Sequence, residues 1–188
     1  MTGAAGKAPP FLIFRKERRV CMEKLSLRVF PDPVLREETK PVTRFDGSLK
    51  DLVAEMARLM NQHDGVGLAA PQAGVPLKLA IVFFGGVLYV LANPQLLSFE
   101  GEQEGEEGCL SFPGIFGNVK RPLKIRVRHQ DISGGEHEIE AEGFLARAFL
   151  HEMDHLEGKL LIDHFSPMKR NMARKKLLRS GSVAGSGN

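Results

Sequence analysis

Five consecutive residues, His151-Glu152-Met153-Asp154-His155, have the side chains from which a hydrolytic metal site is built. Residues four positions apart lie on one face of a helix, so His151 and His155 can offer two imidazoles to one ion. An intervening glutamate is typical of H-E-x-x-H hydrolases, where it acts as general base. The alternative is a solvated charged helix face. The nearly all-apolar segment 144–150 argues against it, because buried polar groups need partners.

A catalytic site of this kind needs a third protein ligand. Leu161 stands where metzincin proteases carry a third histidine, and no glutamate follows Gly158 to complete a thermolysin-type set. The remaining donors are Asp163 downstream and Cys109 upstream. Cys109 could be a small buried residue, but it follows an acidic, glycine-containing loop, and a thiolate with two imidazoles suits a first-row divalent ion. We therefore favour Cys109 and regard Cys21 as uninvolved.

A third segment, Gly65-Val66-Gly67-Leu68-Ala69-Ala70-Pro71-Gln72, is rich in small residues. Glycines let a backbone approach a ligand closely, although such loops also simply pack tightly. The Gln72 amide could be a surface group or a donor aimed into a site.

Together, G-V-G-L-A-A-P-Q at 65–72, E-G-C-L-S at 107–111 and H-E-M-D-H at 151–155 resemble the three signature motifs of peptide deformylases, in order and in spacing. The similarity extends over roughly Met22 to Pro167. The resemblance implies an α+β fold, with antiparallel β-sheets packed around a central helix that carries HExxH. It also implies removal of the formyl group from the N-terminal formyl-methionine of newly made bacterial and organellar proteins, with release of formate.

The resemblance also implies roles for individual residues. Three would ligate the metal ion: Cys109, His151 and His155. Fe²⁺ is the expected physiological ion, and Zn²⁺, Ni²⁺ or Co²⁺ could also occupy the site. Glu152 would act as general base and then acid, while the Gln72 side chain and the backbone N–H of Leu110 would stabilise the oxyanion. The attacking group would be metal-bound water, deprotonated near neutral pH.

The side chain of the substrate methionine requires an apolar pocket. Our candidates for the substrate site are Val66, Gly67, Gly108, Phe144 and Ala148. Phe144 and Ala148 could equally belong to the core. The resemblance further implies that Arg121 pairs with Asp154 and holds the metal-bearing helix. Phe116 stands where many members of the family carry a polar or charged residue, so the rim of the site is expected to differ here.

Periodicity predicts the helices that position these residues. Apolar residues at i, i+3, i+4 and i+7 predict a helix over 48–62, begun by a capping box of Ser48 and Asp51. A second helix is predicted at 144–157, ending at Gly158. A third, with Ser166 as its cap, should run from 166 to about 179.

Strands are predicted between the helices. Two apolar runs at 75–84 and 87–91, joined by Gly85-Gly86, predict a hairpin. Alternation at 123–128 and at 137–141 predicts two half-buried strands. The acidic stretch 100–107 is expected to be mostly a solvated loop, with only its last residue belonging to a motif. This arrangement indicates α+β rather than a doubly wound α/β fold.

The chain has 188 residues, 43% hydrophobic and 26% charged, as expected for one globular domain with tails. We place a catalytic domain at 22–179, an N-terminal extension at 1–21 and a disordered tail at 180–188. No apolar run approaches the ~20 residues that span a bilayer, so no membrane partner is expected. Two cysteines cannot build a disulfide framework. The extension does not have the order of a secretory signal, and a bacterial cytoplasmic location is favoured over import into an organelle.

The net charge of +3 does not by itself indicate nucleic-acid binding. The third predicted helix, however, carries six basic residues and no acid: Lys169, Arg170, Arg174, Lys175, Lys176 and Arg179. They could form a solvated face or contact phosphate-rich RNA, which for an enzyme of nascent chains means the ribosome. Two other functions are weaker. If the chain were a metalloprotease, the third metal ligand of the known types would be missing. A non-catalytic metal-binding or RNA-binding module would not explain the presence of Glu152 and Gln72.

Overall fold

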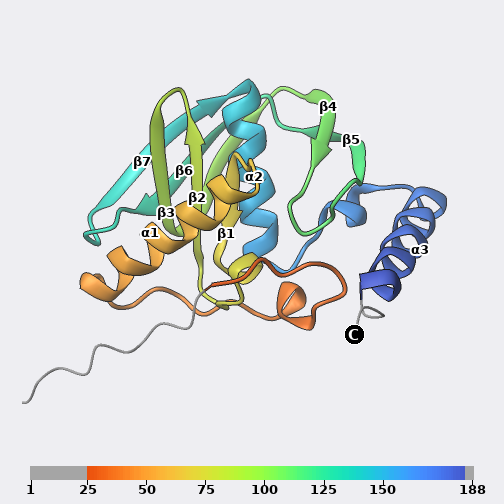
Figure 1. Cartoon of the computed structure of the whole chain (residues 1–188). Coiled ribbons are helices and arrows are strands. Elements are labelled where there is room, and N and C mark those ends of the chain that lie inside the picture. Colours follow the sequence, from red (N-terminus) through yellow and green to blue (C-terminus); the bar gives the residue numbers. More distant parts are fainter. Residues whose placement is uncertain (1–24, 185–188) are drawn as a thin grey trace, which may run out of the picture.

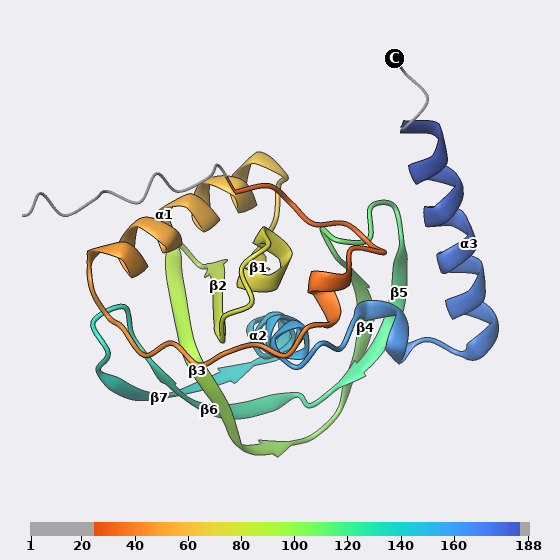
Figure 2. The same ribbon diagram turned by 90° about the horizontal axis from the view of Figure 1, so that it is seen from below.

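Antiparallel β-strands surround the helix α2 (Gly143–Leu156), which is seen end-on in Figure 2. A computed structural model describes residues 25–184 of the chain (Figure 1). The larger sheet has the order β1-β2-β3-β6-β7, and β4 and β5 form a separate pair. The strands are β1 (Gly67–Ala69), β2 (Leu79–Phe84), β3 (Val87–Glu100), β4 (Gln103–Gly108), β5 (Phe116–Arg121), β6 (Lys124–Gln130) and β7 (Glu136–Glu142). The predicted α+β class is confirmed.

Helix α2 is held by its apolar face. Phe149 is fully buried and meets the ring of Tyr89 edge-on, with ring centroids 5.4 Å apart. The face packs against residues of the large sheet: Val82, Leu91, Ile125, Val127 and Ala141. The helix ends as predicted before Gly158, whose φ of +68° lies in the left-handed region that favours glycine. The metal-binding motif is therefore carried by a helix fixed between sheets.

The predicted first helix is confirmed as α1 (Gly47–Gln62), but its predicted cap is wrong. The N-cap residue is Asp46, whose carboxylate accepts a hydrogen bond from the backbone N–H of Ser48 at 2.9 Å. Ser48 itself lies inside the helix. Aspartate at N-cap stabilises a helix start as serine does, so the helix begins one residue before the predicted boundary. The apolar side of α1 packs on the other face of the large sheet, with Met56 and Met60 at its centre.

The hairpin through Gly85-Gly86 is confirmed, but its strands have other bounds. β2 begins at Leu79 rather than at 75. The 3₁₀ turn η2 (Ala70–Ala73) precedes it, and the residues between them bond to another segment, where Leu77 forms an isolated bridge with Lys40. β3 continues well past 91, the predicted end of this run, to Glu100. Asn93, at φ +51°, shifts the register and bonds through its side chain to the backbone of Val42. The strand therefore passes through an irregularity at Asn93 and does not end at 91.

The expectation of a solvated loop over 100–107 is wrong. Residues from Gln103 onward form β4, paired with β5. Glu104 and Glu106 point to solvent while Glu107 is buried, as the period of two in a strand requires. The strand predicted at 123–128 begins one residue later, and Leu123 is half-exposed outside it. The strand predicted at 137–141 is confirmed as part of β7.

Helix α3 (Pro167–Ala184) begins where predicted, with the Ser166 hydroxyl accepting from the backbone N–H of Lys169 at 3.4 Å. It continues past the predicted end at 179. Ala173 and Leu177 bury its inner side against an apolar cluster that includes the short helices η1 (Pro33–Arg36) and η3 (Leu161–His164). The extension expected at 1–21, Cys21 and residues 185–188 of the expected tail lie outside the described residues. Between residues 25 and 184, no helix combines the length and hydropathy needed to cross a membrane.

Candidate metal centre

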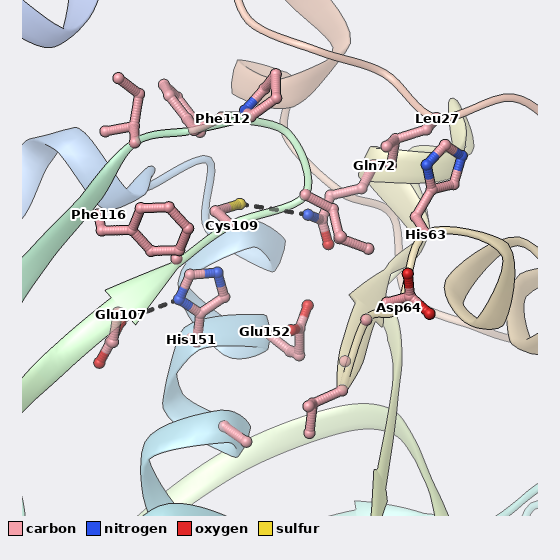
Figure 3. A pocket seen from close by; sticks show the side chains of 18 of the residues that line it. Leu27, His63, Asp64, Gln72, Glu107, Cys109, Phe112, Phe116, His151 and Glu152 are labelled. Atoms are coloured by element: carbon pink, nitrogen blue, oxygen red, sulfur yellow. Dashed lines mark hydrogen bonds and ion pairs between the residues drawn. The ribbon is translucent and has the colours of Figure 1, made fainter.

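The structure brings Cys109, His151 and His155 together at α2. Figure 3 shows Cys109 and His151 side by side. One ligand atom from each lies within 4.8 Å of the others, and the Cys109 sulfur is 3.2 Å from Nε2 of His155. The two histidines come from successive turns of α2, while Cys109 follows directly after β4. Asp163, the alternative ligand, instead pairs with Arg36 away from the site. The structure therefore places Cys109, the donor favoured from the sequence, beside the two histidines, and Asp163 elsewhere.

The charges of these side chains suit a cation. Burial by itself raises the pKa of the Cys109 thiol, but the imidazoles of His155 and His151 outweigh it and lower the pKa to about 5. Burial tends to lower the pKa of His151, yet hydrogen bonds with Cys109 and Glu107 raise it well above its usual value. Cys109 is therefore a thiolate at neutral pH. One thiolate and two imidazole nitrogens would suit a first-row divalent ion, so the donor set fits such a metal.

A buried carboxylate, Glu107, fixes the first histidine. Its Oε1 accepts from Arg121 Nε at 2.9 Å and from Arg147 at 2.9 Å, and its Oε2 lies 3.0 Å from Nδ1 of His151. Burial raises the pKa of Glu107, but hydrogen bonds with His151 and Arg121 outweigh it and bring the pKa to about 2. The carboxylate holds the Nδ1 side of the ring and leaves Nε2 for the metal site.

Arg121 connects this carboxylate to the second half of the helical motif. It donates to Asp154 at 2.6 Å as well as to Glu107, so it joins β5, β4 and α2. Burial raises the pKa of Asp154, but His164 and Arg121 outweigh it and lower the pKa. The expected Arg121–Asp154 contact is present. The contacts of Glu107 and Arg147 were missed, because the sequence of β4, Gln-Glu-Gly-Glu-Glu-Gly, has no apolar alternation that would indicate a buried carboxylate.

Glu152 lies beside the ligands with one oxygen unsatisfied. Burial raises the pKa of its carboxyl group to about 7. Within residues 25–184, Oε2 of Glu152 is buried and has no hydrogen-bond partner, as is expected of a group that handles a water molecule. A Cβ on Gly67 would lie 2.3 Å from Oε1 of Glu152, so glycine is required for β1 to come this close. Gly65 lies equally close to Leu110, where a Cβ would be 2.7 Å from Cδ1.

Gln72 is buried and oriented, which excludes the alternative of a surface amide. Its Oε1 accepts from the backbone N–H of Ala69 at 2.8 Å, so the amide nitrogen points the other way. Nε2 lies 3.2 Å from the Ser111 hydroxyl and 3.5 Å from the Cys109 sulfur (Figure 3). The 3₁₀ turn η2 thus directs a hydrogen-bond donor toward the metal ligands.

A cavity of about 690 Å³ opens beside these groups, a volume typical of ligand sites. The five substrate candidates all line it: Val66, Gly67, Gly108, Phe144 and Ala148. Phe144 is 52% exposed and stacks on Phe84, so it is not a core residue. Phe116 is 57% exposed on the opposite rim and lies over Gly108, where a Cβ would be 2.6 Å from its ring. The rim is therefore aromatic on both sides.

Comparisons with known proteins agree with this arrangement. The model of the polypeptide deformylase family matches residues 24–171. A peptide deformylase of Thermotoga sp. (strain RQ2) is 48% identical over 153 residues, which cover 81% of this chain and 93% of the relative. One of Caldanaerobacter subterraneus is 49% identical over 137 residues, or 73% and 86% of the two chains.

Solved structures give the same result. A peptide deformylase crystal structure from Legionella pneumophila superposes with a TM-score of 0.82 at 42% identity, covering 88% of this chain and 100% of the other. The Thermotoga maritima enzyme superposes with a TM-score of 0.74 at 44% identity, covering 77% and 99%.

Replacing the thiolate tests the ligand set. Cys109→Ala should abolish tight metal binding, because two imidazoles alone leave the ion short of a charged ligand. Metal content per chain, measured after anaerobic loading and desalting, should fall from about one toward zero. Cys21→Ala is the matched control and should retain the full metal content. Equal loss in both variants, or full retention in Cys109→Ala, would contradict the assignment.

Proposed function

The chain belongs to the peptide deformylase family and removes the N-terminal formyl group from newly made polypeptides, and we propose a specific division of labour among its site residues. The observation that carries the proposal is the placement of buried Glu152, with its raised pKa, beside Cys109, His151 and His155. Glu152 thus lines the same cavity as two of the three ligand candidates, Cys109 and His151.

The family is metal-dependent, and Cys109, His151 and His155 would hold the ion. A divalent ion bound there lowers the pKa of a water molecule toward ~7 and so provides the nucleophile at neutral pH. We propose Fe²⁺ as the physiological ion, with Zn²⁺, Ni²⁺ and Co²⁺ able to replace it. Fe²⁺ and a free thiolate both require a reducing compartment, which supports a cytoplasmic location.

Glu152 moves the proton. A carboxyl group with a pKa of about 7 is poised both to accept a proton from water and to return it near neutral pH. Oε2, which has no partner within residues 25–184, is the atom that takes the proton. After the formyl carbon–nitrogen bond breaks, the same group protonates the departing amine. Formate and the free N-terminus are the products.

Charge that develops on the formyl oxygen needs donors already in place. The Gln72 amide meets this need, because its carbonyl oxygen is fixed by Ala69 and its Nε2 faces Cys109. The backbone N–H of Leu110 is the second donor. Gly65 lies against Leu110, and Gly67 of β1 lies against Glu152. We propose that this close wall selects formyl, the smallest acyl group.

The methionine side chain occupies the cavity beyond the metal ligands. Phe144 and Ala148 lie on the same face of α2 as His151, and Val66 lies across the cavity on the segment before β1. Gly67 and Gly108 expose backbone on the two sides of the cavity. An extended peptide can pair with such backbone as an added strand.

Removing the proton carrier tests the mechanism. Glu152→Gln should retain metal but lower kcat for formyl-Met-Ala-Ser by roughly 10²–10⁴, since a neutral amide cannot accept the proton. Glu157→Gln, the same change at an exposed position just beyond α2, is the control and should leave kcat unchanged. Release of free amine gives the rate. Turnover by metal-loaded Glu152→Gln at the wild-type rate would remove this residue from the mechanism.

We further propose that α3 contacts the ribosome. Its inner side is committed to the core through Ala173 and Leu177, while Arg174, Lys175 and Arg179 are exposed. Figure 2 shows α3 standing at the side of the molecule, apart from α2 and the large sheet. A helix with basic residues and no acid attracts phosphate-rich RNA without entering the active site.

Charge reversal on α3 distinguishes ribosome binding from deformylation of a short peptide. A triple change of Arg174, Lys175 and Arg179 to Glu should leave turnover of a short formyl peptide intact and weaken ribosome binding in co-sedimentation by at least ~10-fold at low salt. The control reverses the same number of exposed charges elsewhere, at Lys40, Lys50 and Lys78. Ribosome binding that is unaffected by the α3 changes, or affected equally by the control, would contradict the proposal.

A further inference from the structure

Ser111 is a buried polar residue that the mechanism above does not use. It follows Cys109 and Leu110 in the segment after β4, and it is fully buried. It is not among the described residues that line the cavity, although its neighbours Leu110 and Phe112 are. A buried hydroxyl needs a hydrogen-bond partner, and the Gln72 amide is such a partner. Ser111 therefore lies behind the proposed oxyanion donor and outside the cavity that we assign to the substrate.

The Ser111 hydroxyl accepts one of two hydrogen bonds that fix the Gln72 side chain. At one end of the amide, Oε1 accepts from the backbone N–H of Ala69 at 2.8 Å, and at the other end Nε2 donates to the Ser111 hydroxyl at 3.2 Å. The terminal torsion of a glutamine side chain has only a broad preference, so one hydrogen bond at Oε1 leaves the plane of the amide free to turn. The second hydrogen bond, at Nε2, fixes that plane.

The hydroxyl also determines which N–H of Gln72 remains for the site. Nε2 of glutamine carries two hydrogens, which point in different directions. The Ser111 hydroxyl accepts one of them, and Nε2 lies 3.5 Å from the Cys109 sulfur on the side of the metal ligands (Figure 3). The second hydrogen is therefore left for that side, where a donor is needed as charge develops on the formyl oxygen.

The backbone of both residues is held without the help of this hydroxyl. The N–H of Arg28 donates to the backbone oxygen of Gln72 at 2.7 Å, and the N–H of Phe30 donates to the backbone oxygen of Ser111 at 3.0 Å. The segment 28–30 thus joins η2 to the segment after β4 through the main chain. A variant without the hydroxyl keeps these backbone bonds, so its activity reports on the contact between the two side chains.

We propose that Ser111 is a positioning residue for deformylation and that it acts through Gln72. Its hydroxyl holds the plane of the amide, so that one N–H of Nε2 is directed at the formyl oxygen as this oxygen gains charge. The inference rests on the proposed role of Gln72 as an oxyanion donor. A donor of this kind stabilises the transition state more than the bound substrate, so loss of the hydroxyl lowers kcat and leaves KM nearly unchanged.

A double-mutant cycle on Ser111 and Gln72 tests the inference, with kcat and KM measured for formyl-Met-Ala-Ser. Ser111→Ala should lower kcat by roughly 10-fold, which is part of the ~10²–10³-fold loss expected when Gln72→Ala removes the whole donor. KM and the metal content per chain should stay at their wild-type values. In the Gln72→Ala background, Ser111→Ala should lower kcat no further, because the group that it positions is already absent.

The cycle separates positioning from a general loss of structure. A structural effect of Ser111→Ala would lower kcat equally in the wild-type and Gln72→Ala backgrounds, and that result would overturn the inference. A wild-type kcat in Ser111→Ala would overturn it as well. Ser98→Ala makes the same change at an exposed position on β3 and should leave kcat unchanged. A wild-type kcat in Gln72→Ala would contradict the proposed oxyanion donor itself and, with it, the role of Ser111.

Discussion

The carboxylate of Glu107 is the interaction on which the rest of the site depends. It is buried between two guanidiniums and an imidazole, and it comes from a strand while its partners come from another strand and from α2. Two cations, Arg121 and Arg147, are balanced by two carboxylates, Glu107 and Asp154, so the buried charges compensate one another. Removing any one of them would leave the charges of this cluster unbalanced.

This network positions the site residues on the fold. The large sheet and α1 bury apolar surface, and that packing fixes α2 as a rigid support. The carboxylate then orients His151, and the small pair of strands brings Cys109 to the helix. Glycines at 65 and 67 allow the opposite wall to approach Glu152, whose burial raises its pKa to about 7. Ligands, proton carrier and oxyanion donor thus come from different elements held at one place.

Much of this could be predicted from local patterns, because helical spacing alone places two histidines on one face. The choice of Cys109 over Asp163 rested on the glycine-containing loop before the cysteine and on the family motif, and the structure adds a physical reason, because Arg36, distant in sequence, engages the aspartate. β4 was not predicted because its residues are mostly acidic. Its alternation of exposed and buried positions can be recognised only once Glu107 is seen to have buried partners. Likewise β3 continues through an Asn-Pro pair because tertiary hydrogen bonds satisfy Asn93. Local sequence patterns fail to predict the structure where a polar side chain finds its partner in a distant segment of the chain.

The most direct test of this account is the metal dissociation constant of Glu107→Gln. The variant keeps the size of the side chain and all three ligands but loses the charge that holds His151 and both guanidiniums. Glu106→Gln makes the same change one residue earlier, on the exposed face of β4. The account predicts metal binding weakened by roughly 10–100-fold in Glu107→Gln and unchanged in Glu106→Gln. Equal affinity in the two variants would contradict it.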